Sequence, residues 1–258
     1  MRCYRNTAFF ERSELKDKSR GRDIYPLVVE GSPMKLAIII ITALVAVCIP
    51  QAMGQYTAEY WSNQADQYFF NDSFEEAAAS YDKALELDPS NVDLWNNKGK
   101  ALANLGSFED AIACFDRALA INSTYVAALN LKGVALSQGL KRNDEAIASF
   151  DQALQLDSSN FDAWIGKGMA LANSGDFSGS LACFDTATQI EPLNPSGWIN
   201  GGVVLREMGR YQDALDSFNK ALLLDPTHEG AQLNRRYTLQ DMDQNTLAGP
   251  SQSTQGML

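Results

Sequence analysis

A small set of residues recurs about every 34 positions along most of this 258-residue chain. One copy of the set is Trp95, Gly99, Phe115 and Ala118. The other copies are Trp61, Leu129, Trp164 and Trp198 in the first slot; Ala65, Gly133, Gly168 and Gly202 in the second; Tyr81, Phe150, Phe184 and Phe218 in the third; and Ala84, Ala153, Ala187 and Ala221 in the fourth. Successive copies of the first slot are separated by 34, 34, 35 and 34 residues, and all four tryptophans of the protein occupy it. Such a period predicts a stack of similar units rather than one globular core.

Each unit has the pattern of two amphipathic helices joined by a short turn. In the second unit, apolar residues keep helical spacing from Trp95 to Leu102, and Gly106 follows as a stop signal. A second apolar stripe then runs from Ala111 to Leu119 with helical spacing. One such hairpin cannot bury its own apolar face, so neighbouring units are expected to stack with each unit touching only the next.

The order aromatic, glycine, alanine, aromatic, alanine and proline at this period resembles the tetratricopeptide repeat (TPR) family over residues 58–228. The resemblance implies an all-α, right-handed αα-solenoid of five helical hairpins. These hairpins are expected at residues 58–91, 92–125, 126–160, 161–194 and 195–228. The third unit is one residue longer than the others, and we expect the extra residue in the hairpin turn at 139–144, where an insertion costs little.

The chain beyond the repeats divides into two segments. Residues 229–241 have enough helical propensity to form a capping helix over the last hairpin. Residues 242–258 are polar and rich in Gln, Ser, Thr and Gly, which predicts a disordered tail.

The N-terminal part of the chain has the pattern of an export signal. Residues 1–33 form a charged extension without periodicity, and residues 36–49 are 14 uncharged, mostly apolar residues that follow Lys35. Residues 34–54 therefore predict a secretory signal peptide or, if the segment is retained, a signal anchor. Our hypothesis is that Met34 rather than Met1 is the true start, because signal peptides rarely follow a charged extension. No Lys or Arg lies between Lys35 and Lys83, which places the repeats outside the cytoplasm. The expected location is extracellular or in the cell envelope, with membrane attachment only through residues 34–54.

The charge of the repeat region limits the partners that it can bind. From Gln55 onward the sequence has 13 Lys and Arg against 27 Asp and Glu, a net charge of −14. Binding to nucleic acid depends on cationic side chains that neutralise phosphates, so an acidic solenoid is not expected to bind it. An alternative interpretation is that the acidic residues only keep an exported repeat protein soluble.

The sequence contains no constellation that indicates catalysis, a metal or a cofactor. The only histidine, His228, lies after the fifth unit without a cue to a partner. Asp157 and Asn160 carry side-chain oxygens of the kind that bind calcium, but the glycine and glutamate of a calcium loop are missing, so helix capping is the better interpretation. Cys114 and Cys183 share one slot of the second helix and are interpreted as small packing residues. No enzymatic activity is expected.

In the TPR family the first helix of each hairpin lines a concave face that holds a peptide or a partner helix. The resemblance assigns two sets of slots to this groove. Those just after the tryptophan position include Asn63, Asn96, Asn97, Asn130, Ile165, Ile199 and Asn200. Those one turn further are Asp66, Lys100, Val134, Met169 and Val203.

The groove slots resemble a known family pattern only in part. Asn63, Asn97 and Asn200 match the asparagine ladder by which some members hydrogen-bond a peptide backbone, whereas Leu131 and Gly166 interrupt it. The basic residues that clamp an acidic C-terminal tail in chaperone-type members are absent from these slots apart from Lys100. An equally good explanation is that asparagine is simply common at these positions in TPR sequences.

Two classes of function remain open from the sequence. The first is a monomeric, non-catalytic scaffold that binds an unidentified protein or peptide in the concave groove. The second is an accessory subunit that selects substrates for an envelope enzyme. The fold does not identify the ligand.

Overall fold

The computed structural model describes residues 56–248, which form eleven α-helices and one π-helical turn. Ten of these helices pair into five hairpins. The first helices of the hairpins are α2 (Ala58–Phe70), α4 (Val92–Asn104), α6 (Val126–Val134), α8 (Phe161–Asn173) and α10 (Pro195–Glu207). The second helices are α3 (Phe74–Leu87), α5 (Phe108–Ile121), α7 (Asn143–Leu156), α9 (Phe177–Ile190) and α11 (Tyr211–Leu224). A single helix, α12 (Glu229–Ala248), follows them. The predicted all-α solenoid of five hairpins with a capping helix is confirmed.

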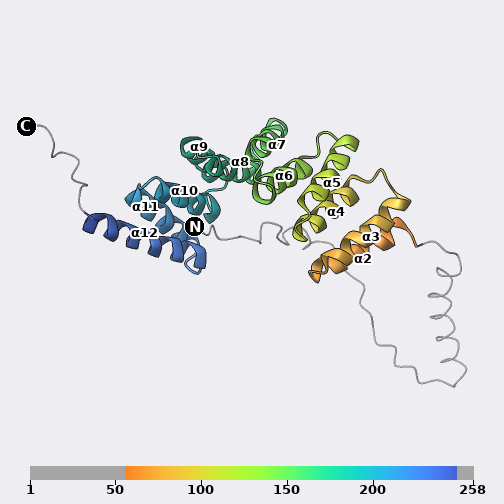
Figure 1. Ribbon diagram of the computed structural model, residues 1–258, viewed down its shortest axis with the longest axis horizontal. Helices are drawn as coiled ribbons and strands as arrows, with labels where there is room; N and C mark the ends of the chain where they lie inside the picture. The colour runs from red at the N-terminus through yellow and green to blue at the C-terminus, as the bar shows by residue number, and fades with distance from the viewer. Residues whose placement is uncertain (1–55, 249–258) are drawn as a thin grey trace, which may run out of the picture.

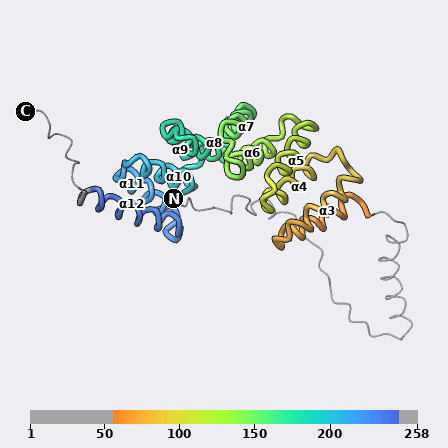
Figure 2. The backbone as a smooth tube through the Cα atoms, in the orientation of Figure 1, coloured from red at the N-terminus to blue at the C-terminus, as the bar shows by residue number. Residues whose placement is uncertain are grey.

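The hairpins are arranged along an arc, with α2 and α3 at one end and α12 at the other (Figure 1). The tube in Figure 2 follows this arc in sequence order. First helices of neighbouring hairpins contact each other directly, as α6 contacts α8 and α8 contacts α10. In Figure 1, α7 and α9 lie along the outer edge of the arc. The first helices therefore line its inner side.

Asparagine side chains begin several of the first helices. The side-chain oxygen of Asn91 accepts a hydrogen bond from the backbone N–H of Leu94 at 3.2 Å, and Asn160 accepts one from Ala163 at 2.9 Å. Each bond satisfies an N–H group that has no partner within its own helix. The interpretation of the junction residues as helix caps is confirmed for these two asparagines.

His228 performs the same task at the last junction. Its Nδ1 atom accepts a hydrogen bond from the backbone N–H of Ala231 at 3.2 Å. Gln232 then donates a hydrogen bond to the carbonyl of Pro226, six residues before it, at 2.7 Å. Trp95 makes the equivalent bond to the carbonyl of Pro89, also six residues before it, at 2.9 Å. The helix α12 is therefore built like a sixth first helix, with glutamine in the tryptophan slot.

A buried phenylalanine fills the centre of each of the last four hairpins, opposite a glycine of the first helix. These rings, all at most 2% exposed, are Phe115, Phe150, Phe184 and Phe218. A Cβ atom added to Gly99 would lie 2.5 Å from the Phe115 ring, and one added to Gly202 would lie 2.7 Å from Phe218. Glycine thus lets the two helices of a hairpin approach closely enough to enclose the ring.

The extra residue of the third hairpin lies earlier than we predicted. The end of the first helix widens into the π-helical turn η1 (Ala135–Gly139), so the insertion is absorbed before most of the expected turn at 139–144. Such a turn holds one more residue than an α-helical turn while the hydrogen-bonded backbone continues. The helix can therefore take up the insertion without moving the second helix out of register.

Lys141 marks the point where this hairpin reverses direction. Its φ angle is +61°, whereas the second, fourth and fifth hairpins have a glycine at the equivalent place, for example Gly106 at +82°. A side chain in this left-handed region costs about 1–2 kcal/mol. We expect Lys141→Gly to raise the free energy of unfolding by about 0.5–1 kcal/mol, because relief of this strain exceeds the extra chain entropy that glycine loses on folding.

Urea unfolding measures this effect, and Gly106→Ala is the matched control. No atom lies within 4 Å of a Cβ added at Gly106, so the control tests backbone conformation alone. It should lose about 1 kcal/mol. Stabilisation by both substitutions, or by neither, would contradict the conformational explanation.

The capping helix is longer than the sequence suggested. It continues through Ala248, seven residues beyond the predicted end at 241, so residues 242–248 are not part of a disordered tail. Thr238 is fully buried, and Asp241 is ion-paired with Arg206 at 2.6 Å, which fixes the helix against the last hairpin up to the predicted end. The first helix-breaking pair after that point is Gly249-Pro250.

The proposed signal segment and the charged extension lie outside the described residues, as do residues 249–258 of the predicted tail. Within residues 56–248, no helix is long and apolar enough to cross a membrane.

Candidate partner-binding face

Side-chain contacts join three pairs of neighbouring first helices along one face, which we call the inner face. At its N-terminal end the ammonium group of Lys100 lies 6.0 Å from the ring centre of Phe69. In its middle Asn173 donates to the hydroxyl of Ser137 at 3.4 Å. At its C-terminal end the guanidinium of Arg206 lies over an aromatic ring of α12. The first contact joins α2 to α4, the second joins the end of the third hairpin's first helix to α8, and the third joins α10 to α12.

The slot directly after the tryptophan position is buried rather than open to a ligand. Asn96 is 5% exposed and Ile165 is 1% exposed. Asn130 is half-buried and donates its amide N–H to the side-chain oxygen of Asn160 at 2.9 Å, and Ile199 is also half-buried. The structure thus buries Asn96 and Ile165 of this predicted slot, and Asn130 links the third hairpin to the start of the fourth.

The next slot carries the predicted asparagine ladder. Asn63 is exposed, and Asn97 and Asn200 are half-buried. The ladder is interrupted at Gly166 for a steric reason, because a Cβ atom there would overlap the ring of Phe150 from the preceding hairpin. Packing between the third and fourth hairpins therefore excludes an asparagine at this position.

The slot one turn further holds the side chains that are partly open on the inner face. Lys100, Met169 and Val203 are half-buried, whereas Val134 is only 5% exposed. Asp66 already accepts a hydrogen bond of 2.5 Å from the hydroxyl of Tyr81. Burial, followed by this bond to Asp66, raises the pKa of Tyr81 well above its ordinary range.

Several residues of the inner face were missed by sequence reasoning. Arg206 lies 5.6 Å from the ring centre of Tyr237 and forms an ion pair of 2.6 Å with Asp241. Tyr237 is 40% exposed and stands 34 residues after Val203, in the same slot. Continuing the repeat spacing through Gln232 into the capping helix would have identified it.

On the opposite side of the first helices, lysines form ion pairs with aspartates of the preceding second helix. The pairs are Lys98–Asp82 at 2.5 Å, Lys132–Asp116 at 2.6 Å and Lys167–Asp151 at 2.6 Å. The slot holds Gly201 in the fifth hairpin, so the equivalent pair with Asp185 is not formed. These charges link successive hairpins, and each exposed pair is worth at most about 1 kcal/mol.

Both cysteines of the described region pack as small buried residues. Cys114 and Cys183 are each 4% exposed. Burial raises the pKa of the Cys114 thiol from its ordinary 9.0 to about 11 and also raises the pKa of Cys183. Among residues 56–245, no group of three or more potential metal-ligating side chains comes together.

The raised thiol pKa values predict a loss of stability at high pH. Below about pH 9 the thiol is protonated in both states and the folded chain has its full stability. Between pH 9 and 11 the unfolded chain loses the Cys114 proton first, so the free energy of unfolding should fall over that interval. Cys114→Ser should reduce this fall, because a serine hydroxyl does not lose its proton in this interval. Serine suits the site, since the other hairpins carry it in this slot at Ser80, Ser149 and Ser217. Urea unfolding at pH 8 and pH 10.5 measures the difference, and an unchanged slope would contradict the burial effect.

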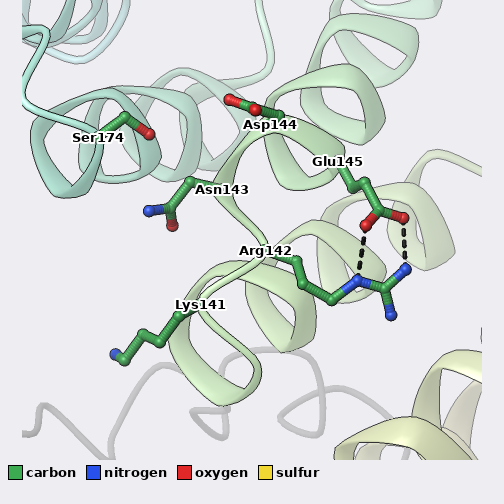
Figure 3. Close-up of a pocket in the computed structure, with 6 residues that line it drawn as sticks. All are labelled: Lys141, Arg142, Asn143, Asp144, Glu145 and Ser174. Atoms are coloured by element: carbon green, nitrogen blue, oxygen red, sulfur yellow. Dashed lines mark hydrogen bonds and ion pairs between the residues drawn. The ribbon is translucent and has the colours of Figure 1, made fainter.

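A shallow depression of about 260 Å³ lies at the turn of the third hairpin (Figure 3). Its lining is charged or polar, with Lys141, Asn143 and Ser174 around the Arg142–Glu145 pair. Both oxygens of Glu145 accept hydrogen bonds from the Arg142 guanidinium, at 2.6 and 2.5 Å. This pairing lowers the pKa of Glu145 and raises that of Arg142. The Arg142 and Glu145 charges therefore neutralise each other, and we take the inner face as the candidate for ligand binding.

Sequence profiles described as "Tetratricopeptide repeat" match residues 63–126, 104–161, 137–198 and 195–228, which together span the five hairpins. No curated protein matches the chain.

Solved structures share the fold. YrrB, described as "a TPR protein with an unusual peptide-binding site", is 26% identical, with a TM-score of 0.54 over 69% of this chain and 92% of YrrB. MamA from Desulfovibrio magneticus RS-1 is 19% identical, with a TM-score of 0.59 over 67% and 97% of the two chains. The protein TTC0263 from Thermus thermophilus is 17% identical, with a TM-score of 0.60 over 71% and 100%.

Proposed function

Because the chain belongs to the tetratricopeptide repeat family of non-catalytic protein–protein interaction scaffolds, we propose that it binds an extended segment of a partner protein along the inner face. The observation that carries this proposal is the partial exposure of one slot along the inner face: Lys100, Met169 and Val203 are half-buried and Tyr237 is exposed, whereas Val134 of the same slot is buried. The peptide-binding site described for YrrB supports the same kind of ligand.

The chemistry of the inner face indicates what the bound segment looks like. Its centre is apolar, at Met169 and Val203, and its ends are polar, with Lys100 at one end and Arg206 at the other. The Arg206 charge is already shared with Asp241, so a strongly acidic tail would find little free positive charge. The inner face fits a segment with apolar side chains at its centre and uncharged polar residues on both sides.

We further propose that the scaffold works on the outer side of a membrane. The support is the apolar stretch at residues 36–49 after Lys35, together with the absence of Lys and Arg up to Lys83. The net charge of −14 beyond Gln55 makes the solenoid itself unsuited to anionic lipid surfaces.

The binding face can be tested with peptides from a random phage-displayed library. The peptides are selected for binding to the full chain. Val203→Lys on the inner face should weaken binding of the selected peptides at least tenfold, because it buries a charge under the apolar centre of the ligand. The matched control is Leu223→Lys on α11, where the side chain is 83% exposed, and it should leave binding unchanged. Peptides that respond only to the control substitution would contradict the proposal.

A further inference from the structure

One face of α2, the first helix of the first hairpin, is exposed, whereas the equivalent face of each later first helix is buried. Tyr60 and Gln67 lie on α2 in two slots that the preceding hairpin buries elsewhere in the chain. The buried counterparts are Leu94 and Ala101, Ala128 and Ala135, Ala163 and Ala170, Gly197 and Val204, and Ala231 and Thr238. Tyr60 is 43% exposed and Gln67 is exposed. The end of the solenoid nearest the N-terminal segment therefore presents an uncovered face.

This face carries a cluster of aromatic rings, which we call the aromatic tip. Tyr56 stacks on Tyr60 with ring centres 4.1 Å apart, and Trp61 packs edge-on against both at 5.3 Å. The ammonium group of Lys83 lies 4.0 Å from the Trp61 ring centre. Leu87, one turn beyond Lys83 on α3, is 47% exposed. Tyrosine and tryptophan, which combine an apolar ring with a polar atom, are enriched where proteins meet the headgroup region of a bilayer.

The position of the apolar segment determines what can cover the aromatic tip. The stretch at residues 36–49 has 14 residues, fewer than the roughly 20 that usually span the roughly 30 Å hydrocarbon core. A span that is too short draws its flanking residues into the bilayer interface. Residues 50–57 lie between this segment and α2 and reach at most about 28 Å. Tyr56 and Tyr60 would then be held at the membrane surface.

We infer that residues 36–49 remain attached as an anchor and that the aromatic tip rests in the headgroup region of the bilayer. This inference rests on the proposed location outside a membrane. Exposed Glu59 and Glu86 accompany Lys83 at the tip, so its contact is with zwitterionic headgroups and not with an anionic surface. In this arrangement the solenoid extends away from the membrane, and the inner face stays open to a partner.

Hydroxyl-radical footprinting of the full chain in phosphatidylcholine nanodiscs tests the covered face without any substitution. Tyr60 and Tyr237 are 43% and 40% exposed at opposite ends of the solenoid, so they serve as a matched pair in one sample. Oxidation of Tyr60 should be several-fold slower than that of Tyr237. Equal oxidation in nanodisc-bound protein would overturn the inference and leave the export proposal intact. A chain that does not co-purify with nanodiscs would overturn both the anchor and the inference.

Brominated phosphatidylcholine identifies lipid as the occupant. We compare two variants with a single tryptophan, one retaining Trp61 and one retaining Trp198. Trp198 is the matched control because it holds the same slot with Lys220 at 4.3 Å from its ring centre. Bromine should quench Trp61 several-fold more strongly than Trp198, and replacing half of the lipid by phosphatidylglycerol should not increase the quenching. Protection of Tyr60 without quenching of Trp61 would mean that a protein segment or a second copy covers the tip, which would overturn the inference. A mature protein from the native host that begins at Gln55 would overturn it as well.

Discussion

Replacing Phe150 by alanine is expected to lower the free energy of unfolding by about 3–5 kcal/mol. The ring is 1% exposed and packs against Gly133 in its own hairpin and Gly166 in the next. It therefore contributes to two interfaces, one between the helices of the third hairpin and one between the third and fourth hairpins. In a solenoid each unit depends on its neighbours, so a cavity here should also weaken the coupling between the two halves of the molecule.

Urea unfolding monitored by circular dichroism and by tryptophan fluorescence measures both effects of Phe150→Ala. We expect a lower unfolding midpoint. We also expect unfolding to split into two steps, one for each half of the molecule, because weaker coupling allows one half to unfold first. The control is Leu223→Ala, an 83% exposed position at which the change should stay within about 0.5 kcal/mol. A loss at Phe150 no larger than the control would contradict the packing of its ring between the two glycines.

The hairpins could be predicted from the sequence because each repeats the same local solution. Tryptophan, glycine, phenylalanine and alanine recur at positions where the helices must touch, and the glycine opposite each phenylalanine follows from the volume of the ring. Trp95, Gly99 and Phe115 were thus sufficient to define the architecture. Capping by Asn91 and Asn160 was predictable for the same reason, since a helix start needs a nearby acceptor.

The features that escaped prediction depend on contacts between hairpins. The burial of Asn96 and Ile165 is set by how closely one first helix approaches the next, which no single unit encodes. The turn η1 shows the same limit, because the insertion could be placed in the third hairpin but not within it. The role of Tyr237 was missed because α12 carries Gln232 where a tryptophan was sought. The asparagine ladder at Asn63, Asn97 and Asn200 stays a prediction, as does the use of the inner face.

The two sides of the first helices differ in the contacts that they make. The side that faces the preceding second helix carries the lysine–aspartate pairs that link hairpins, from Lys98–Asp82 to Lys167–Asp151. The inner face carries the side chains that vary most in polarity between hairpins. The junction between the fourth and fifth hairpins lacks its ion pair and is the weakest of these links by this measure.

Gly166→Asn, which would extend the asparagine ladder through the fourth hairpin, is expected to lower the free energy of unfolding by about 1–3 kcal/mol. The new Cβ atom would overlap the Phe150 ring, and this ring has no free space to retreat because Gly133 bounds its other side. Asparagine gains a few tenths of a kcal/mol over glycine in helix propensity, which is too little to offset the overlap. Gly201→Ala is the matched comparison, since it also removes a glycine from the interior of a first helix. Its added Cβ would meet only the Phe184 Cβ at 3.8 Å, an ordinary contact, so we expect a gain of about 0.5–1 kcal/mol. Opposite signs for the two substitutions in urea unfolding would show that Phe150, and not helix propensity, keeps asparagine out of position 166. A stable Gly166→Asn variant would instead mean that the ladder is interrupted for a reason connected with the ligand.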